Sequence, residues 1–520
     1  MRLRRAQPGE APAPARSTRS RMIIAALAGA ASVFSFAPFG WWPLQLLCLA
    51  VLFYQVLRAS SVKASALVGW AFGFGWCLAG VHWLYVALNR FGELAAPPAA
   101  ISIALLAVFM GGYSALAMGA GAWLRKRFAM PLPAANLLLL PALWAVGEWA
   151  RGWVFTGFSW ASAGYAHNVS PLSGFAPVLG VYGISWLVAL SAGALLLLMH
   201  RTRAAALALI AVVWGAGFGL QYVQWTHAEG KPLSVRLVQG NIALKAKFDP
   251  NHMQSTLRQY QQAVMAAPAD LIATPETAVP LFPHQLPAGY LDSFGQFARR
   301  SGSSIVLGIP LMDSPSQYSN SVIGLAPTLG PKPYRYDKHH LVPFGEFIPP
   351  GFRWFTNLMQ IPLGDQTRGA VLQPAFRVKD QRVLPNICYE NLFGEEIAEQ
   401  LAEDAQPATV LLNVSELAWY GESLAIPQHL QISQMRTLET GRPMLSATNS
   451  GATVMIDHQG IVKASLPYYQ PGVLNTTVQG MGGTTPYILL QNRLILALAA
   501  LAVIAACLWS KSLQVRAKNR

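Results

Sequence analysis

Eight apolar segments place the strongest constraint on what this chain can fold into. A helix needs about 20 mostly apolar residues to cross the hydrocarbon core of a bilayer. Charged residues make up only 12% of the chain, against about 25% in ordinary soluble domains. We therefore expect a polytopic α-helical membrane bundle of about eight spans, seven within residues 22–225 and the eighth at 487–509. The segments lie near 22–38, 43–57, 66–88, 99–124, 134–150, 177–199, 204–225 and 487–509.

The positive charges predict how these spans are oriented. The formal net charge is +15, and if the N-terminus is cytoplasmic the short outside loops hold only Arg90 and Arg151. This asymmetry is the one that the positive-inside rule describes. We expect basic cytoplasmic tails at 1–21 and 510–520, with anionic lipid and not nucleic acid as the partner of the basic residues. The inside set has 17 members: Arg2, Arg4, Arg5, Arg16, Arg19, Arg21, Arg58, Lys63, Arg125, Lys126, Arg127, Arg201, Arg203, Lys511, Arg516, Lys518 and Arg520.

The N-terminal tail and the first apolar segment also have the layout of a signal peptide. The second apolar segment, however, begins only a few residues after the first, across the run Gly40-Trp41-Trp42-Pro43. This spacing favours an uncleaved helical hairpin.

Residues 226–486 have a different composition and read as an α/β domain outside the membrane. Buried-type strand runs alternate with helical stretches, which is typical of an α/β sandwich. About 260 residues are enough to bury a core. The strand runs are Val235–Val238, Leu271–Ala273, Ile305–Ile309, Val383–Ile387, Val410–Leu412 and Met444–Ala447, and the helical stretches are 251–267, 288–300, 394–404 and 426–440.

A cysteine at the end of one of these strands is a candidate nucleophile. Cys388 lies in the run L-P-N-I-C-Y-E-N, shortly before a predicted helix start at Gly394. A helix N-terminus facing the thiol would favour the thiolate, although a lone cysteine after a strand is more often a small buried apolar residue. The other cysteines, Cys48, Cys77 and Cys507, fall in predicted spans, so we expect no disulfide and no CxxC metal site. An unpaired thiol outside the cytoplasm needs another reason.

Two more stretches supply polar groups that suit the same chemistry. Glu276 follows a strand in D-L-I-A-T-P-E-T, and Lys338 and Glu346 lie in Y-D-K-H-H-L-V-P-F-G-E-F. Ligands gather at the carboxyl ends of strands in α/β sheets, so Glu276 and Cys388 can share a crevice. A carboxylate, a cation and a thiol are what acyl transfer needs. Taken singly, Pro-Glu is usually a turn and a loop lysine a solvated charge, and His339 and His340 lack a metal-ligand set, so we expect neither metal nor cofactor.

The order of the motifs adds specificity that no single motif has. P-E, Y-x-K-x-x-L-V-P-F-G-E, I-C-Y-E and N-x-S-x-x-A-W-Y-G at 413–421 together resemble the nitrilase superfamily with its Glu-Lys-Cys triad. The L-V-P-F-G-E-F element combined with eight spans resembles the apolipoprotein N-acyltransferases of the bacterial inner membrane. The resemblance implies an αββα sandwich in the periplasm, with Glu276 as general base, Lys338 as oxyanion stabiliser and Cys388 as nucleophile.

The resemblance also assigns residues around the triad. It makes Glu346, Tyr389, Glu390 and Asn320 supporting residues, and Trp419 and Phe248 substrate contacts. Phe248 stands where the family often has Trp, Thr274 where W-P-E is common, and Glu416-Leu417 where Asn-Asp is frequent.

One membrane-side loop resembles the family as well. The run G-F-S-W with Gly164-Tyr165 is similar to the family pattern G-F-P-W…G-Y, with Ser159 in place of Pro, and this implies substrate contacts for Trp160 and Tyr165. From the residues alone, an aromatic belt at the membrane interface is the simpler interpretation of this loop. Glu148 and Arg151, one turn apart at a span end, suggest an ion pair or a headgroup contact.

The resemblance implies a two-step acyl transfer. Cys388 would take the sn-1 acyl chain of a phospholipid, such as phosphatidylethanolamine, and the α-amine of a diacylated apolipoprotein would receive it. A membrane-tethered amidase with the same triad is the alternative, but one anchor would then suffice. A transporter bundle with a binding module would predict charged residues along a path through the spans, and the predicted spans hold almost none.

Overall fold

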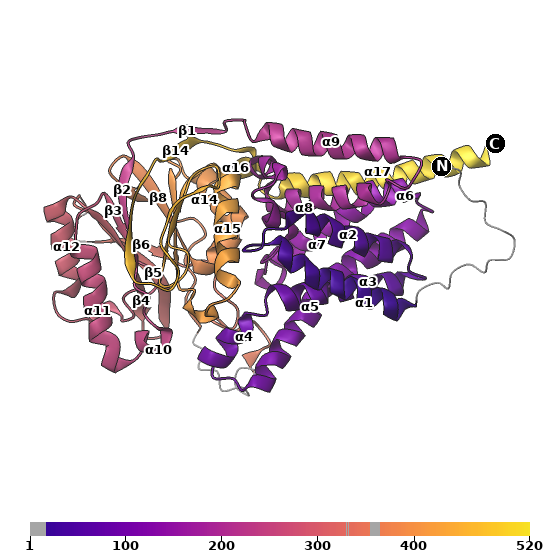
Figure 1. The fold of residues 1–520 in the computed structure, drawn as a ribbon. Helices are drawn as coiled ribbons and strands as arrows, with labels where there is room; N and C mark the ends of the chain where they lie inside the picture. The colour runs from indigo at the N-terminus through magenta and orange to yellow at the C-terminus, as the bar shows by residue number, and fades with distance from the viewer. Residues whose placement is uncertain (1–16, 329, 331, 354–364, 520) are drawn as a thin grey trace.

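The computed structural model describes residues 17–328, 330, 332–353 and 365–519, and it divides into a helical bundle and an α/β domain (Figure 1). Most of the expected N-terminal tail, residues 1–16, lies outside the described residues. The bundle contains a helix at each of the eight predicted apolar segments. These helices are α1 (Thr18–Ala31), α2 (Trp42–Leu57), α3 (Val62–Gly80), α5 (Ala96–Arg127), α7 (Leu140–Trp153), α8 (Ala176–Leu195), α9 (Arg203–Leu220) and α17 (Arg493–Lys518).

Six helices of the described residues are long and apolar enough to span a membrane. α1 has 14 residues and α2 has 16, and neither is among the six. α7 also has 14 residues, but it is part of a 25-residue helical stretch, Leu132–Thr156, that is long enough. The predicted segment 22–38 is not one helix, because α1 ends at Ala31 and the chain is already extended at Phe36, ahead of the Ala37-Pro38 pair. A proline disfavours helical backbone in the residue before it.

The third predicted segment, 66–88, is also divided. α3 ends at Gly80 and is followed by the short α4 (Leu84–Val86). Two side chains satisfy the last carbonyls of α3: the Trp83 indole N–H donates to Gly80 O at 3.1 Å, and His82 Nδ1 lies 2.8 Å from Ala79 O. Such contacts stabilise helix ends whose carbonyls have no partner within the helix.

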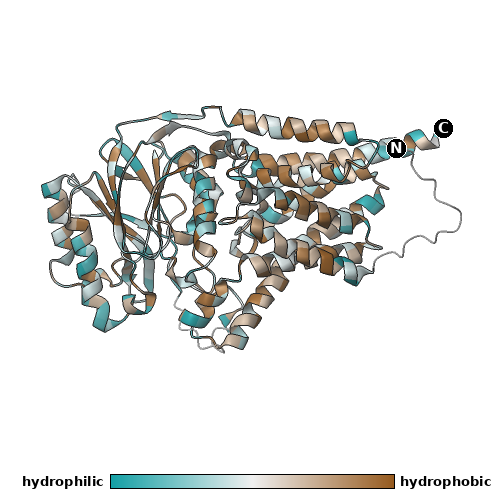
Figure 2. Ribbon diagram, viewed as in Figure 1, coloured by the Kyte–Doolittle hydropathy of each residue, from teal (hydrophilic) through white to brown (hydrophobic). Residues whose placement is uncertain are grey.

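Small residues let α1 and α3 pack closely. A Cβ atom at Gly29 would lie 2.1 Å from Phe72 O, and one at Gly75 would lie 2.1 Å from Ala26 O. Close backbone approach at glycine is a common means of association between membrane helices. Figure 2 shows the bundle as the more apolar half of the molecule.

The α/β domain is an αββα sandwich, as predicted. One six-stranded sheet has the order β13-β2-β3-β4-β5-β6 and the other β12-β11-β10-β9-β8-β7. The centre of each sheet is parallel and the outer strands are antiparallel. The strands are β2 (Leu233–Gln239), β3 (Leu271–Ala273), β4 (Ser304–Ser314), β5 (Gln317–Leu325), β6 (Tyr334–Asp337), β7 (Phe376–Val378), β8 (Gln381–Ile387), β9 (Val410–Ser415), β10 (Met444–Thr448), β11 (Val454–Ile456), β12 (Val462–Ser465) and β13 (Gly472–Val478).

Apolar side chains hold the four layers together. Leu237 and Val306 of the first sheet share one buried cluster with Leu412 and Val414 of the second. Two helices, α11 (Pro250–Met265) and α12 (Tyr290–Ser301), cover the outer face of the first sheet. Two others, α14 (Gly394–Glu403) and α15 (Ala425–Thr440), pack against the second sheet.

α15 lies between the second sheet and the bundle (Figure 1). Its residues Ile432 and Met435 belong to the same buried cluster as Tyr182 of α8. The α/β domain therefore packs on the membrane bundle through a shared core.

The chain enters and leaves the α/β domain at one place. β1 (Thr226–Ala228) follows α9 and pairs antiparallel with β14 (Met481–Gly483). β14 leads through α16 (Pro486–Leu490) into α17. The two crossings thus form a single two-stranded ribbon.

Candidate active site

Cys388 is the first residue of a short 3₁₀ turn and does not lie at the N-terminus of an α-helix. After β8 the chain passes through a 3₁₀ turn over Cys388–Leu392, and α14 begins only at Gly394. Cys388 has a φ of 54°, which is uncommon for a residue other than glycine and is often found at functional sites. Its side chain is 9% exposed.

The Glu390 carboxylate holds this turn in place. Its Oε2 accepts from the backbone N–H of Ile387 at 2.6 Å and from the Tyr336 hydroxyl at 3.1 Å, and its Oε1 accepts from the His339 N–H at 2.6 Å. One side chain therefore links the nucleophile turn to the segment that carries Lys338.

Glu276, Lys338, Glu346 and Asn320 form one buried network, although they come from four parts of the α/β domain. Lys338 Nζ lies 3.4 Å from Glu276 Oε1 and 2.7 Å from Glu346 Oε1. Asn320 Nδ2 donates to the same two oxygens at 2.7 and 3.1 Å. Lys338 is 1% exposed, so its charge is balanced by carboxylates and not by water.

The protonation states in this network follow from burial and from the neighbouring charges. Burial and the Glu276 carboxylate raise the pKa of the Cys388 thiol well above its ordinary value, against the opposing effect of Lys338. The thiol is therefore protonated at rest, and the expectation of a dipole-stabilised thiolate is wrong because no α-helix starts at Cys388 and burial disfavours the anion.

Glu276 and Lys338 are both ionised. Burial opposes the ionisation of Glu276, but Lys338, the Asn320 amide and the Glu416 N–H together hold its pKa below the ordinary value. Burial likewise opposes the charge on Lys338, and the carboxylates of Glu346 and Glu276 outweigh it and raise the Lys338 pKa. The site thus brings together a neutral thiol, a carboxylate that can accept its proton, and a fixed ammonium.

A second buried ion pair supports Glu276 from the other side. Lys247, at the end of α10 (Leu244–Lys247), is completely buried, and its Nζ lies 2.5 Å from Glu416 Oε2 and 3.0 Å from the backbone carbonyl of Glu276. The Glu416 N–H donates to Glu276 Oε2 at 2.7 Å. Glu416, a departure from the family pattern, therefore balances the charge of Lys247. Lys247 was not predicted, although it precedes Phe248, because its partner Glu416 lies far away in the chain.

The other departures occupy different environments. Thr274 is buried and bridges β3 to β4, since its hydroxyl donates to Val306 O at 3.3 Å and accepts from the Gly308 N–H at 3.1 Å. Phe248 is 52% exposed. Its role as a substrate contact stays a prediction.

Two aromatic residues of the predicted belt lie inside the protein. Trp160 is 2% exposed, and its indole N–H donates to Gln428 Oε1 of α15 at 2.7 Å. Tyr165 is 1% exposed. An interfacial belt is therefore the wrong interpretation for both, because a belt faces lipid headgroups.

Tyr389 and Trp419 lie where the bundle meets the α/β domain. The Tyr389 hydroxyl donates to Gly157 O at 2.8 Å. Trp419 is partly exposed, and its ring packs edge-on against that of Phe91, with ring centroids 5.8 Å apart. Whether Trp419 contacts substrate stays a prediction.

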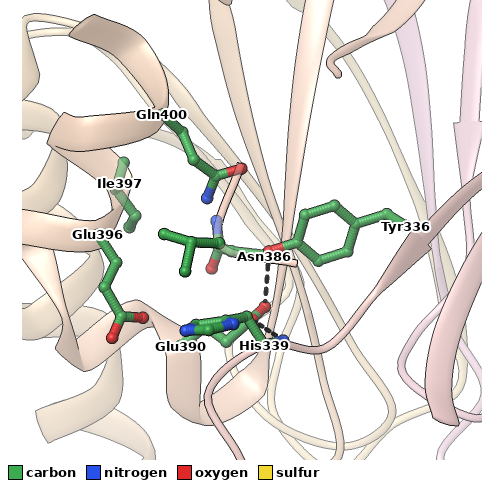
Figure 3. A pocket seen from close by; sticks show the side chains of 8 residues that line it. Tyr336, His339, Asn386, Glu390, Glu396, Ile397 and Gln400 are labelled. Carbon is green, nitrogen blue, oxygen red and sulfur yellow. Dashed lines mark hydrogen bonds between the residues drawn. The ribbon is translucent and has the colours of Figure 1, made fainter. Parts of the chain in front are cut away.

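A small polar pocket adjoins Glu390 (Figure 3). Asn386 Nδ2 and Gln400 Oε1, both buried, have no hydrogen-bond partner among the residues that the structure describes. A donor and an acceptor together suit an ordered water. Across the same described residues, no group of three or more His, Cys, Asp and Glu side chains is arranged to hold a metal ion.

Comparisons with known proteins agree with this architecture. Residues 28–194 match the family model described as apolipoprotein N-acyltransferase N-terminal domain, and residues 234–487 match carbon-nitrogen hydrolase. Apolipoprotein N-acyltransferase of Ralstonia nicotianae is 45% identical, with 93% of this chain and 92% of the relative covered. That of Bordetella bronchiseptica is 42% identical, with 93% and 96% covered, and that of Nitrosomonas europaea is 41% identical, with 94% and 97% covered.

Among solved structures, an amidase from Nesterenkonia sp. is 18% identical and covers 49% of this chain and 92% of its own, with a TM-score of 0.34. The apolipoprotein N-acyltransferases, by contrast, match nearly the whole chain, including both the bundle and the α/β domain. The protein therefore belongs to the apolipoprotein N-acyltransferase family, as a membrane acyltransferase with a carbon-nitrogen hydrolase domain.

Proposed function

We propose that this protein moves the sn-1 acyl chain of a membrane phospholipid, phosphatidylethanolamine, to the N-terminal α-amine of the S-diacylglyceryl-cysteine of apolipoproteins. Cys388 carries the chain as a thioester between the two steps. The observation that carries the proposal is the buried network in which Lys338 Nζ lies 3.4 Å from Glu276 Oε1 and 2.7 Å from Glu346 Oε1, with both Glu276 and Lys338 acting on the buried Cys388 thiol.

In the first step Glu276 accepts the thiol proton while the Cys388 sulfur attacks the ester carbonyl carbon. The tetrahedral oxyanion forms beside the Lys338 ammonium, which stabilises it. The carbon–oxygen bond then breaks, Glu276 returns the proton to the departing glycerol oxygen, and a lysophospholipid leaves.

In the second step the α-amine of the acceptor attacks the thioester carbonyl. Glu276 accepts a proton from the nitrogen, the carbon–sulfur bond breaks, and the proton returns to the Cys388 sulfur. A single base thus serves both half-reactions, because each one moves a proton away from the attacking atom and onto the leaving atom.

The residues around the triad have supporting roles in this scheme. Glu346 fixes Lys338, Asn320 fixes Glu276, and Glu390 shapes the nucleophile turn. Phe248 and Trp419 are the proposed contacts for acyl chain or headgroup, and their exposure supports this role. Trp160 and Tyr165 are buried and are better suited to holding the site than to binding substrate.

We also infer that the α/β domain faces the periplasm and that both termini are cytoplasmic, in the bacterial inner membrane. The excess of Arg and Lys in the alternate loops supports this orientation. It would place the thiol on the side of the membrane where a lipid-anchored acceptor could reach it without leaving the bilayer.

The test supplies labelled phosphatidylethanolamine and a diacylated lipopeptide to the purified protein. Lysophospholipid and N-acylated peptide are expected together, and intact-protein mass spectrometry should find one acyl group, labile to hydroxylamine, when the peptide is left out. Cys388→Ser should form no such thioester, and Cys507→Ser is the matched control that should behave as wild type.

Two outcomes would contradict the proposal. An acyl thioester on Cys388→Ser would remove Cys388 as the carrier. Release of free fatty acid without N-acylated peptide would favour hydrolysis, as in an amidase that uses the same triad.

A further inference from the structure

A loop of the helical bundle contacts the turn that carries the nucleophile. We name residues 157–165 the clamp loop and residues 388–392 the nucleophile turn. The Tyr389 hydroxyl donates to Gly157 O at 2.8 Å, and Leu392 O accepts from the Ser159 hydroxyl at 3.1 Å and from the Tyr165 hydroxyl at 3.4 Å. The clamp loop therefore holds both ends of the nucleophile turn.

Arg151, at the end of α7, holds the clamp loop in turn. Its Nη1 donates to Phe158 O at 2.6 Å and to Trp160 O at 3.0 Å, and its Nη2 donates to the Ser162 hydroxyl at 2.9 Å. Its guanidinium also lies over the Trp76 ring, 4.3 Å from the centroid. The planar fork of an arginine can bind several oxygens at fixed angles.

The backbone near the clamp loop needs such support. Phe155, Thr156 and Ala161 have φ angles of 55°, 73° and 55°. Residues other than glycine rarely adopt these values unless the surrounding structure imposes them. Glu148, one helical turn before Arg151, accepts from the Ala163 N–H at 3.0 Å and so holds the C-terminal part of the clamp loop.

From these contacts we infer that Arg151 is a positioning residue for Cys388, acting through the clamp loop from within the membrane bundle. The inference rests on the proposed role of Cys388 as nucleophile. A charge buried at a membrane span is costly and marks a function, and here each hydrogen bond of the guanidinium ends on the clamp loop. The bundle thus sets the geometry of the catalytic sulfur as well as anchoring the enzyme.

A small pocket beside Arg151 and Glu148, lined also by Trp76 and Trp144, suggests a different role. Arg151 could bind a lipid phosphate there. The two roles differ kinetically: a positioning residue changes kcat for thioester formation, whereas a headgroup ligand changes KM for the phospholipid.

The experiment compares Arg151→Met, Arg151→Lys and the surface control Arg201→Met in liposomes of phosphatidylethanolamine. Arg151→Met should lower kcat of thioester formation by about 100-fold, the loss that a displacement of about 1 Å can cause, with KM changed less than about 2-fold. Arg151→Lys should recover part of kcat because it keeps the charge and some donors, and Arg201→Met should match wild type. An unchanged kcat, or a raised KM with normal kcat, would overturn the inference.

A second variant keeps the test decisive if Arg151→Met fails to accumulate in the membrane. Tyr389→Phe combined with Ser159→Ala removes two hydrogen bonds between the clamp loop and the nucleophile turn and leaves Arg151 in place. A lower kcat with normal KM supports the inference, and wild-type kcat contradicts it. Cys388→Ser in the same assay separates the two proposals: activity in that variant defeats the proposed function, whereas an inactive Cys388→Ser beside a fully active Arg151→Met defeats only this inference.

Discussion

The helical bundle and the α/β domain bury their charged side chains in different ways. In the bundle, Arg21 donates to the side-chain oxygen of a glutamine at 2.9 Å, and Arg151 donates to backbone carbonyls and a hydroxyl. In the α/β domain, Lys247 and Lys338 lie against carboxylates. The first arrangement uses a charge to fix the position of neutral groups, and the second uses opposite charges to set where protons lie.

The two arrangements predict different effects when a buried charge is removed. Loss of a bundle charge should disturb geometry, as the Arg151 experiment tests. Loss of a charge in the α/β domain should change proton affinities or leave a partner charge buried alone. Three substitutions in the α/β domain test this contrast.

The largest effect should come from Glu276→Gln, which keeps the shape of the side chain but removes the base. We expect thioester formation to slow by about 10²–10⁴-fold, the usual contribution of a general base. Because burial and the Glu276 carboxylate raise the pKa of Cys388, the variant should also alkylate with iodoacetamide at lower pH than wild type does. Mass spectrometry of the acyl-enzyme and of the alkylated protein measures both.

Glu403→Gln, at an exposed position of α14, is the control and should match wild type. Normal thioester accumulation in Glu276→Gln would remove Glu276 from the proposed triad. If Glu276→Gln is alkylated over the same pH range as wild type, the charge of Glu276 does not act on the Cys388 thiol.

A smaller effect, on stability, should follow from Lys247→Met. It leaves the Glu416 carboxylate buried without a counter-charge, which costs about 3–5 kcal/mol in comparable buried pairs. The double variant Lys247→Met with Glu416→Leu should recover most of this loss. Thermal unfolding of the purified protein gives the Tm values.

The matched control for that cycle is Lys463→Met, which breaks the surface pair of Lys463 and Asp457, 3.1 Å apart. Exposed pairs contribute at most about 1 kcal/mol, so its Tm should stay close to that of wild type. If Lys247→Met is as stable as the control, the buried Glu416 carboxylate does not need its counter-charge, and the contrast between the two regions fails.

The smallest effect should appear at Glu439 of α15, whose carboxylate accepts from the Val181 N–H of α8 at 2.8 Å and also pairs with Arg436. Burial raises the pKa of Glu439 to about 7, against the opposing effect of Arg436. The folded protein therefore binds this proton more tightly than the unfolded chain does, and the resulting stability is lost as pH rises from the ordinary value of 4.5 through about 7.

Glu439→Gln should remove this component of the pH dependence. We expect Tm to fall less between about pH 5 and about pH 8 in the variant than in wild type, whatever the absolute stability of the variant. An identical slope in the two proteins would mean that Glu439 does not titrate in this range.

Helices and strands could be predicted from the sequence where burial requires a continuous run of apolar residues. The apolar segments became helices, and runs such as Leu271–Ala273 became strands with those bounds, because both faces of a central parallel strand are buried. β5 (Gln317–Leu325) and β13 (Gly472–Val478) were missed, since each contains a run of polar residues, 319–321 and 475–477, that resembles a loop in a short window.

The site was predictable only in part, for a related reason. Glu276, Lys338 and Cys388 were found because motif order is visible in the sequence. Lys247 was missed because its partner Glu416 lies 169 positions away in the chain. Arg151 was missed because the clamp loop that it holds meets the nucleophile turn only in the fold. The helix-dipole argument for a thiolate at Cys388 failed because the pKa of the thiol depends on burial and nearby charge, which a local motif does not contain.

The ribbon of β1 and β14 joins the α/β domain to α17 as well as to α9, because β14 leads through α16 into α17. α17 then packs against α7, where Ala499 and Ala502 contact Ala142. α17 therefore supports the helix that carries Arg151, so a chain cut before α17 would lack this support for its nucleophile while keeping every residue of the triad.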